Sequence, residues 1–326
     1  METSRQNPRS TARETTVSRR TFLGTTASVA AAGTLFAPHI GSAAPSRGSA
    51  AETAVGEFYL SLTDDQKKMM ALPLNDNRRL TINPNWHITK AKIGSFSKKQ
   101  QGIIENIVKG ICSEDGFERF KKQMADDAGG IKNYSVALFG QPGTDKPFEF
   151  ELTGRHHTSR ADGNSLEGVA FGGPIVYGHA AKGNSDKNLF SYQTDRANEV
   201  FKALDTDQRT KALLDKAPSE GAVTLRKAGR KLPGIACADL SGDQKELVTA
   251  VLKDIMLPYR EEDVDEAMKM VEAGGGMDKV HISFYKTGDI DNDGSWDIWR
   301  LEGPTLVTHF RGAPHVHAYI NVAKKV

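Results

Sequence analysis

Cysteine is scarce in this chain of 326 residues, which contains only Cys112 and Cys237. Two cysteines build neither a disulfide framework nor a thiolate metal cluster, and the absence of Cys-x-x-Cys argues against thiol-redox chemistry. In an oxidising compartment the two thiols could still pair if their geometry allowed it. We favour the other interpretation, in which both thiols are buried and unpaired.

Sequence motifs of several common enzyme classes are also missing. The chain has no Gly-x-Ser-x-Gly elbow, no phosphate-binding Gly-rich loop with Lys, and no His-Glu-x-x-His. These absences argue against serine hydrolases and nucleotide-binding enzymes. Basic residues are not clustered either, so we exclude nucleic acid and anionic membranes as partners.

The first 44 residues predict a twin-arginine signal peptide. Arg19 and Arg20 directly precede an apolar stretch, Thr21 to Ala37, and small residues at 41–44 provide a cleavage site. A membrane anchor is the alternative, but Thr, Gly and Ala dilute this stretch, and spans usually need about 20 strongly apolar residues. We therefore expect the twin-arginine export machinery as a partner and a periplasmic or secreted product. Because this route carries folded proteins, it raises the expectation of a metal or redox cofactor.

Removal of this leader changes the charge and leaves one predicted domain. The chain has 43 Lys and Arg against 41 Asp and Glu, and residues 1–44 hold five Arg and two Glu, so the mature chain has 38 against 39. No second apolar span follows, so we expect no membrane span in the mature chain. Residues 45–57 are polar and rich in Ala, Ser and Gly, which predicts a disordered linker before a single domain at 58–326.

A helix-start motif occurs four times in the chain. Each copy is an apolar residue, a capping residue, two further residues and Gln, and the copies lie at 62–66, 96–100, 204–208 and 240–244. In such a capping box the side chain of the capping residue accepts a hydrogen bond from the third helical N–H, and the Gln side chain reaches back to the N–H of the capping residue. The copies within each half are 34 and 36 residues apart, which indicates an internal repeat.

The segments after the second box of each half also match. Apolar residues at helical spacing occupy 103–108 and 247–255. Both halves then change to an alternating pattern with a central turn, at 135–154 and at 281–303. Each half is therefore predicted to contain helices followed by a β-hairpin.

These patterns predict an α+β fold of two pseudo-symmetric helix-helix-β-hairpin repeats. Repeat one spans 58–157, a Gly-rich connecting segment spans 158–199, and repeat two spans 200–326. Because a lone hairpin is barely stable, we expect the hairpins to share one antiparallel sheet with helices packed outside. A groove between the repeats follows from this arrangement.

Histidines gather after each predicted hairpin. His156 and His157 follow the first, while His315 and His317 follow the second and alternate along one predicted strand, so that both face the same side. Two imidazoles on one strand face form a chelating pair, and sites of neutral imidazole without thiolate suit copper, zinc or iron. We predict that both groups share one site for a divalent transition metal. The alternative is that each histidine is an ordinary hydrogen-bonded polar residue.

Other histidines are weaker candidates for this metal site. His179 and His309 are second-tier candidate ligands, and His87 and His281 are interpreted as ordinary polar residues. His179 ends a glycine-bounded segment, 171–179, that could fold over the groove as a ligand-bearing loop. An ordinary surface connection is the alternative.

Three further residues are candidates for catalysis or substrate binding. Glu302 ends the second predicted hairpin and could be a carboxylate ligand or a base that acts on metal-bound water. Pairing with Arg311, without a catalytic role, is the alternative. Arg155 and Arg160 flank the first histidine pair, where a guanidinium suits an anionic or carbonyl-bearing substrate.

Six short motifs stand in a specific order along nearly all of the mature chain. They are Ser61 to Gln66, Gly154-Arg155-His156-His157, Ala203 to Gln208, Leu240-Ser241, Trp299 to Pro304 and His315-Val316-His317. In this order the chain resembles an uncharacterised bacterial family, domain of unknown function 3500. The resemblance implies an exported bacterial protein and no established reaction. Family members continue after His-x-His with Arg and acidic residues, whereas this chain continues with Ala318-Tyr319-Ile320-Asn321.

The leading hypothesis is an exported metalloprotein with a histidine-rich site between two repeats. Its metal could activate water, as in a hydrolase, or handle oxygen, as in an oxidase. A second hypothesis is a non-catalytic protein that binds a small molecule or an envelope glycan, with Trp86, Trp296 and Trp299 as stacking surfaces, although such aromatics are more often core residues. Metal storage or delivery is a third.

Overall fold

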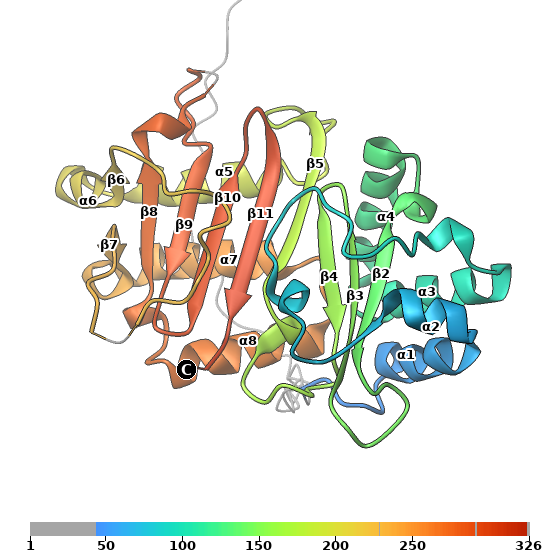
Figure 1. The fold of residues 1–326 in the computed structure, drawn as a ribbon. Helices are drawn as coiled ribbons and strands as arrows, with labels where there is room; N and C mark the ends of the chain where they lie inside the picture. The colour runs from blue at the N-terminus through green and yellow to red at the C-terminus, as the bar shows by residue number, and fades with distance from the viewer. Residues whose placement is uncertain (1–43, 228, 291, 325–326) are drawn as a thin grey trace, which may run out of the picture. The chain divides into compact units, whose positions relative to one another are not determined.

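The computed structural model describes residues 44–227, 229–290 and 292–324, and Figure 1 shows their arrangement. Residues 1–43, which hold nearly all of the predicted signal peptide, lie outside the described residues. The described chain is α+β and contains an 11-stranded sheet. Its order is β1-β2-β3-β4-β5-β11-β10-β9-β8-β6, and β7 pairs with β8 beside this path.

The sheet has helices on one side and long connecting segments on the other. Its strands are β1 (Ala71–Leu72), β2 (Ser135–Gly140), β3 (Phe148–Gly154), β4 (His157–Ala161), β5 (Ile175–Lys182), β6 (Leu213–Leu214), β7 (Ile235–Ala236), β8 (His281–Tyr285), β9 (Ile298–Glu302), β10 (Leu306–Arg311) and β11 (His315–Val322). The helices are α1 (Ala50–Ser61), α2 (Asp64–Met70), α3 (Lys98–Gly110), α4 (Glu114–Ala128), α5 (Tyr192–Ala203), α6 (Thr206–Ala212), α7 (Gly242–Met256) and α8 (Glu261–Ala273). Figure 1 shows the long helices behind the sheet, while segments 73–92 and 215–227 cross its front. We call these sides the helix face and the loop face.

All four predicted capping boxes form, at the starts of α2, α3, α6 and α7. The boxes also join in pairs through their glutamines. Gln66 and Gln100 hydrogen-bond to each other, with their side-chain amide atoms 3.0 Å apart, and Gln208 and Gln244 do the same at 2.8 Å. Each pair therefore ties a short helix to a longer helix of the same half.

The main hydrophobic core lies on the helix face. On β11, Val316, Ala318 and Ile320 are completely buried in this core. His317 and Tyr319 alternate with them and lie on the loop face, as the period-two pattern predicts. A smaller apolar cluster forms there where Val223 of the 215–227 segment packs on Tyr319.

The prediction of a wholly antiparallel sheet is wrong at both edges. The strand pair β1–β2 is parallel, and so is β6–β8. In each case two long helices connect the paired strands, α3 with α4 and α7 with α8. Such a crossover is long enough to return the chain to the same end of the sheet, which a hairpin turn cannot do. The expected hairpins β2–β3 and β8–β9 do form and are antiparallel.

The predicted connecting segment 158–199 also differs from the structure. It contains nearly all of β4, the whole of β5 and the start of α5, so it contributes two strands to the middle of the sheet. Each half thus supplies more antiparallel strands than the predicted hairpin, β2 to β5 in the first half and β8 to β11 in the second. The glycines in this segment concealed the strands, because glycine is depleted in most strands.

The predicted disordered linker at 45–57 is largely helical. Residues 50–61 form α1, which packs against α3, and Ala51, Val55 and Phe58 are completely buried. These three residues stand at positions i, i+4 and i+7, which gives the Ala-rich segment an apolar stripe. The prediction of disorder came from the Ala, Ser and Gly content of the segment. The spacing of its three buried apolar residues indicates a helix instead.

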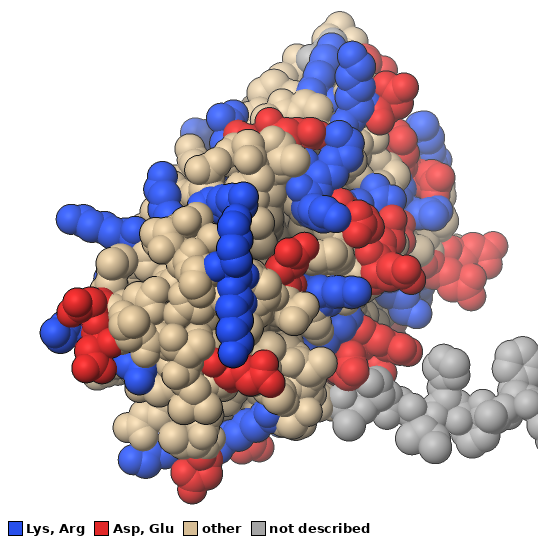
Figure 2. All heavy atoms as spheres, turned by 90° about the vertical axis from the view of Figure 1, so that its right-hand side faces the viewer, with Lys and Arg blue, Asp and Glu red and all other residues tan. Residues whose placement is uncertain are grey.

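Three simpler expectations concern the cysteines, membrane-spanning helices and surface charge of the described residues. Cys112 and Cys237 are free and buried, as favoured. Among the described residues, no helix is long and apolar enough to cross a membrane. Figure 2 shows Lys and Arg side chains mixed with Asp and Glu on the face that it presents, without a continuous basic surface there.

Candidate metal centre

Three of the predicted histidines converge at one end of the central strands. His156 lies in the turn between β3 and β4, and His315 and His317 begin β11. One nitrogen from each imidazole lies within 4.8 Å of the other two. The Nε2 atoms of His315 and His317 are 3.0 Å apart. We call His156, His315 and His317 the histidine cluster.

An unusual backbone conformation brings His156 into this cluster. Its φ of 56° lies in the left-handed region, which is uncommon for residues other than glycine. The turn is held from outside, because the His156 N–H donates a hydrogen bond to the carbonyl of Pro84 in the 73–92 segment. Such conformations cost about 1–3 kcal/mol and concentrate at functional sites.

A carboxylate lies behind each of two imidazoles. Nδ1 of His156 lies 2.7 Å from Asp127 near the end of α4, and Nδ1 of His317 lies 2.8 Å from Glu220 in the 215–227 segment. A carboxylate on Nδ1 fixes the ring so that Nε2 is available to a metal, and this is the usual second contact of a metal-bound histidine. Because Nδ1 of each ring contacts a carboxylate, Nε2 is the nitrogen left to bind a metal, and Nε2 of His317 lies beside Nε2 of His315.

Arg311 of β10 is a cation in contact with the histidine cluster. Its guanidinium forms an ion pair with Glu220 at 2.6 Å and lies 3.2 Å from Nε2 of His315. Glu220 also accepts a hydrogen bond from the hydroxyl of Tyr319 at 3.0 Å. Glu220 thus connects Arg311, His317 and Tyr319, so the position of one segment determines the orientation of several groups.

Burial and hydrogen bonding set the charges in the site. Burial, with the nearby His317 and Arg311, lowers the pKa of His315 to about 4, and burial also lowers the pKa of His317. Burial opposes ionisation of Glu220, but hydrogen bonds from His317 and Tyr319 and the charge of Arg311 lower its pKa to about 2. At neutral pH His315 and His317 are therefore neutral imidazoles beside the charged carboxylate of Glu220, which are the forms that metal sites use.

His157 belongs to the core, although it is adjacent to His156 in sequence. Its ring packs edge-on against Phe120 with the centroids 4.6 Å apart, and its Nε2 contacts the hydroxyl of Ser159. Burial lowers its pKa to about 3. One step along the chain moves a side chain to the other face of a sheet, so the two neighbours have different surroundings.

His179 and His309 also lie outside the cluster. His179 is on strand β5 and not on a ligand-bearing loop at 171–179. Its Nε2 lies 3.2 Å from Asp126. His309 of β10 faces the loop side next to Tyr319, with ring centroids 6.1 Å apart. It is completely buried, and neither ring nitrogen has a hydrogen-bond partner among the described residues.

Glu302 lies away from the histidine cluster. Glu302 of β9 lies opposite Val307 of β10, and Val307 lies opposite Asn321 of β11. Asn321 is four residues beyond His317, which is about 13 Å along the strand. Its carboxylate pairs with Arg226 and Arg300, not with Arg311 as the alternative proposed. The structure therefore does not bring this predicted catalytic residue to the cluster.

The two predicted substrate arginines differ in exposure. Arg160 is buried, with its guanidinium 2.5 Å from Glu149 and 2.8 Å from Glu151, so it is not accessible to a substrate. Arg155 is exposed beside His156, and its backbone carbonyl accepts a hydrogen bond from the hydroxyl of Tyr134. Only Arg155 is in a position to meet a ligand.

The glycan-stacking alternative loses one of its proposed surfaces. Trp299 is completely buried and stacks on Phe310, with centroids 5.0 Å apart. Trp296 is partly buried against the core, and Trp86 donates from its ring nitrogen to Thr158. Trp299 is a core residue, which is the more common role for buried tryptophan.

Sequence reasoning missed Asp127 and Glu220, and it considered Arg311 only as a partner of Glu302. One local signal was available for Asp127. It and Asp126 lie in the last turn of α4, where the helix dipole disfavours carboxylates. Glu220 lies 97 residues from His317 in a segment without a regular pattern, so no local signal indicated its role.

Comparison with known proteins adds a family and no activity. A family model described as "Protein of unknown function (DUF3500)" matches residues 46–322, a range that includes the whole histidine cluster. No curated protein matches the chain, and no solved structure matches it.

Proposed function

The chain belongs to the DUF3500 family of proteins of unknown function, and we propose that it is a metalloprotein in which His156, His315 and His317 bind one divalent transition-metal ion. The supporting observation is the convergence of three imidazoles, two of them oriented by carboxylates on Nδ1. Two nitrogen ligands at about 2.0–2.1 Å from one tetrahedral ion are about 3.3 Å apart, which is close to the 3.0 Å between the Nε2 atoms of His315 and His317.

The ligand set favours zinc or copper over the other metals. Imidazole suits zinc, copper and iron, but mononuclear iron enzymes typically add a carboxylate ligand, and here Asp127 and Glu220 contact Nδ1 atoms. Three protein ligands leave a fourth position for water, which is the arrangement of catalytic zinc sites. The protein is therefore proposed to be a metal-dependent enzyme.

The side chain of Arg311 favours hydrolysis as the reaction. A bound metal would supply Lewis-acid activation of water, and a guanidinium beside it would stabilise negative charge that develops on a carbonyl-bearing or anionic substrate. Arg311 occupies that position, 3.2 Å from Nε2 of His315. We expect Arg311→Met to keep the metal and to reduce the kcat/KM for a hydrolysable chromogenic ester by about 100-fold. An unchanged rate would remove Arg311 from the mechanism.

Metal content is the first test of this proposal. We expect protein purified without chelators to contain close to one zinc or copper ion per chain, measured by inductively coupled plasma mass spectrometry. The His315→Ala/His317→Ala variant should lose the ion, whereas His87→Ala, which replaces an exposed histidine, should retain it. Equal metal content in all three proteins, or a wild-type chain that binds neither added zinc nor added copper, would contradict the metal site. Stoichiometric metal without turnover of any ester would indicate storage or delivery.

Export through the twin-arginine route is part of the proposal. Arg19 and Arg20 support it, and so does a site that would be loaded with metal in the folded state. A fusion of residues 1–44 to a reporter should reach the periplasm of a bacterial host. Replacement of both arginines by lysine should leave the precursor in the cytoplasm, and continued export of that variant would contradict the route.

The two halves are also proposed to be pseudo-symmetric repeats, with boundaries near 50–182 and 192–322. The strand order supports this proposal. From the edge of the sheet to its centre, the strands are β1-β2-β3-β4-β5 in the first half and β6-β8-β9-β10-β11 in the second, so they follow chain order in both halves. If the halves are equivalent, Gln66→Ala and Gln208→Ala should each reduce the free energy of unfolding by about 1 kcal/mol. Costs that differ several-fold would contradict the equivalence.

A further inference from the structure

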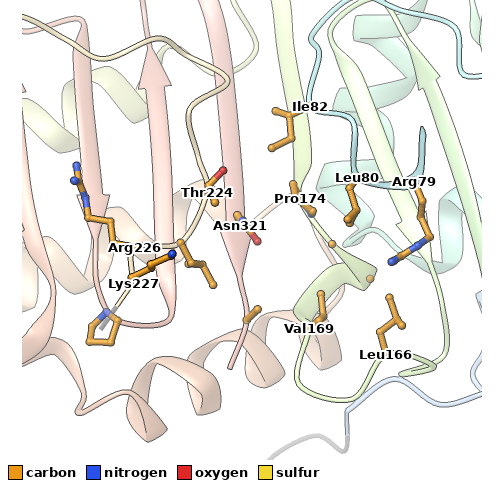
Figure 3. A pocket seen from close by; sticks show the side chains of 15 residues that line it. Arg79, Leu80, Ile82, Leu166, Val169, Pro174, Thr224, Arg226, Lys227 and Asn321 are labelled. Carbon is orange, nitrogen blue, oxygen red and sulfur yellow. The ribbon is translucent and has the colours of Figure 1, made fainter. Parts of the chain in front are cut away.

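A second site lies on the loop face, at the opposite end of β11 from the histidine cluster. A cavity of about 470 Å³ opens there, and Figure 3 shows that Arg79 and Leu80 lie on one side of it and Arg226 and Lys227 on the other. Its apolar lining residues come from both halves of the chain. They include Leu80, Ile82, Leu166, Val169, Pro174 and Leu225.

A second cavity of about 400 Å³ adjoins the first and is strongly cationic. The two share the wall formed by residues 224–227. Among the residues that line the second cavity, four are basic and Glu302 is the only acid. The basic residues are Arg226, Lys227, Arg230 and Arg300. We call the two cavities together the amphiphile pocket.

The cationic charge of this pocket is only partly neutralised. Glu302 pairs with Arg226 and lies 3.3 Å from Nε of Arg300. Arg300 is almost completely buried and donates from Nη2 to the carbonyl of Ala222, but its Nε has no hydrogen-bond partner among the described residues. One buried carboxylate is thus shared between two guanidinium groups, and Lys227 and Arg230 add further positive charge.

The amphiphile pocket is separate from the proposed metal site. Asn321, which lines the apolar cavity, is four residues beyond His317, or about 13 Å along the strand. Tyr319 and Val223 pack together between the two. A ligand of this pocket would therefore not need to contact the metal.

We propose that the amphiphile pocket binds a small molecule with an apolar body and an anionic head group. The apolar cavity would hold the body, while the arginines of the cationic cavity would hold the head group. Guanidinium groups bind carboxylate and phosphate oxygens through two parallel hydrogen bonds, so both head groups fit. The volumes lie within the range of small-molecule sites.

Calorimetric titration with matched probes tests both parts of the pocket. Octanoate and octyl phosphate combine a chain with an anion, octan-1-ol has only the chain, and acetate has only the anion. We expect octanoate or octyl phosphate, or both, to bind at least about tenfold more tightly than octan-1-ol and acetate. The stronger of the two identifies the preferred head group. Equal binding of octanoate, octyl phosphate and octan-1-ol, or no saturable binding of any probe, would overturn the proposal.

Charge-reversal variants locate the binding in the folded protein. Lys227→Glu/Arg230→Glu should weaken octanoate binding by at least about tenfold, because both residues line the cationic cavity. Lys231→Glu is the matched control, since Lys231 is exposed nearby and does not line either cavity. Octanoate should still bind the His315→Ala/His317→Ala variant. Loss of binding in that variant would place the ligand at the metal, and undiminished binding in the charge-reversed variant would overturn the proposed head-group site.

Discussion

Two buried polar clusters lie on the loop face of the same sheet, and they differ in how their charges are balanced. In the first, which we call the Arg160 cluster, Arg160 pairs with Glu149 and Glu151, and Arg79 pairs with Glu149. Two cations thus face two carboxylates. In the histidine cluster, the Nε2 atoms of His315 and His317 lie 3.0 Å apart, and Asp127 and Glu220 contact Nδ1 of His156 and His317.

The difference separates a structural cluster from a binding site. Arg160, Glu149 and Glu151 are completely buried and paired with one another, so they can stabilise the fold but are not accessible to a ligand, whereas the partly exposed Arg79 also lines the amphiphile pocket. The histidine cluster has the carboxylates of Asp127 and Glu220 on its histidines, and Arg311 pairs with Glu220 but not with Asp127, so the site favours an added cation. The following predictions either sharpen or break this comparison.

Loss of Arg160 should have the largest effect, and that effect should be on stability. Arg160→Ala leaves two buried carboxylates without their main partner, which we expect to reduce the free energy of unfolding by about 3–5 kcal/mol. Guanidinium unfolding measures this. Arg155→Ala, at an exposed position five residues away, should change stability by no more than about 0.5 kcal/mol. Similar costs for both substitutions would show that the Arg160 cluster is not structural.

Metal addition should stabilise the protein only through the histidine cluster. At a free zinc concentration 100 times the Kd, binding to the native state adds about 2.7 kcal/mol to its stability. Thermal unfolding of metal-free protein should therefore shift upward on zinc addition. The His315→Ala/His317→Ala variant should show no shift, and an equal shift in that variant would place the metal elsewhere.

The carboxylate behind His317 should tune metal affinity without supplying a ligand. We expect Glu220→Gln to weaken zinc binding by about 10- to 100-fold, as is typical when such a partner is lost. Competition with a chromogenic chelator measures the affinity. Asp126→Asn is the control, because Asp126 contacts His179 outside the cluster. If both substitutions weaken zinc binding equally, the affinity depends on the negative charge near the site and not on the orientation of His317.

The smallest effect concerns the core histidine next to the cluster. Burial lowers the pKa of His157 to about 3, so the folded state disfavours its protonation. Its stabilising contribution is complete above the unfolded pKa of about 6.5 and is lost as pH falls below that value, by about 0.8 kcal/mol at pH 6. Compared with wild type, metal-free His157→Leu should lose less stability between pH 8 and pH 6. Identical losses would mean that His157 is not buried as neutral imidazole.

Features encoded over short stretches of sequence were predictable. The capping boxes depend on residues three positions apart, and all four form. The alternation of His315 and His317 with Val316 and Ala318 correctly assigned the two faces of β11. His156 was predicted to lie near this pair because both groups follow a predicted hairpin at corresponding places in the two repeats.

Features that depend on distant segments were not predictable. Glu220 and Asp127 reach their histidines across 97 and 29 residues, and their neighbours in sequence give no pattern that names a partner. The parallel edge strands have only two residues each, too few for a periodic signal. His157 was misassigned because a turn between β3 and β4 sends two adjacent histidines to different sides.

X-ray absorption at the metal edge of zinc- or copper-loaded protein tests the central claim most directly. The account predicts three imidazole nitrogens at about 2.0–2.1 Å and one further light atom from water. In the His315→Ala/His317→Ala variant this signature should disappear. A metal bound by sulfur, or the same imidazole signature in the variant, would contradict a site built from His156, His315 and His317.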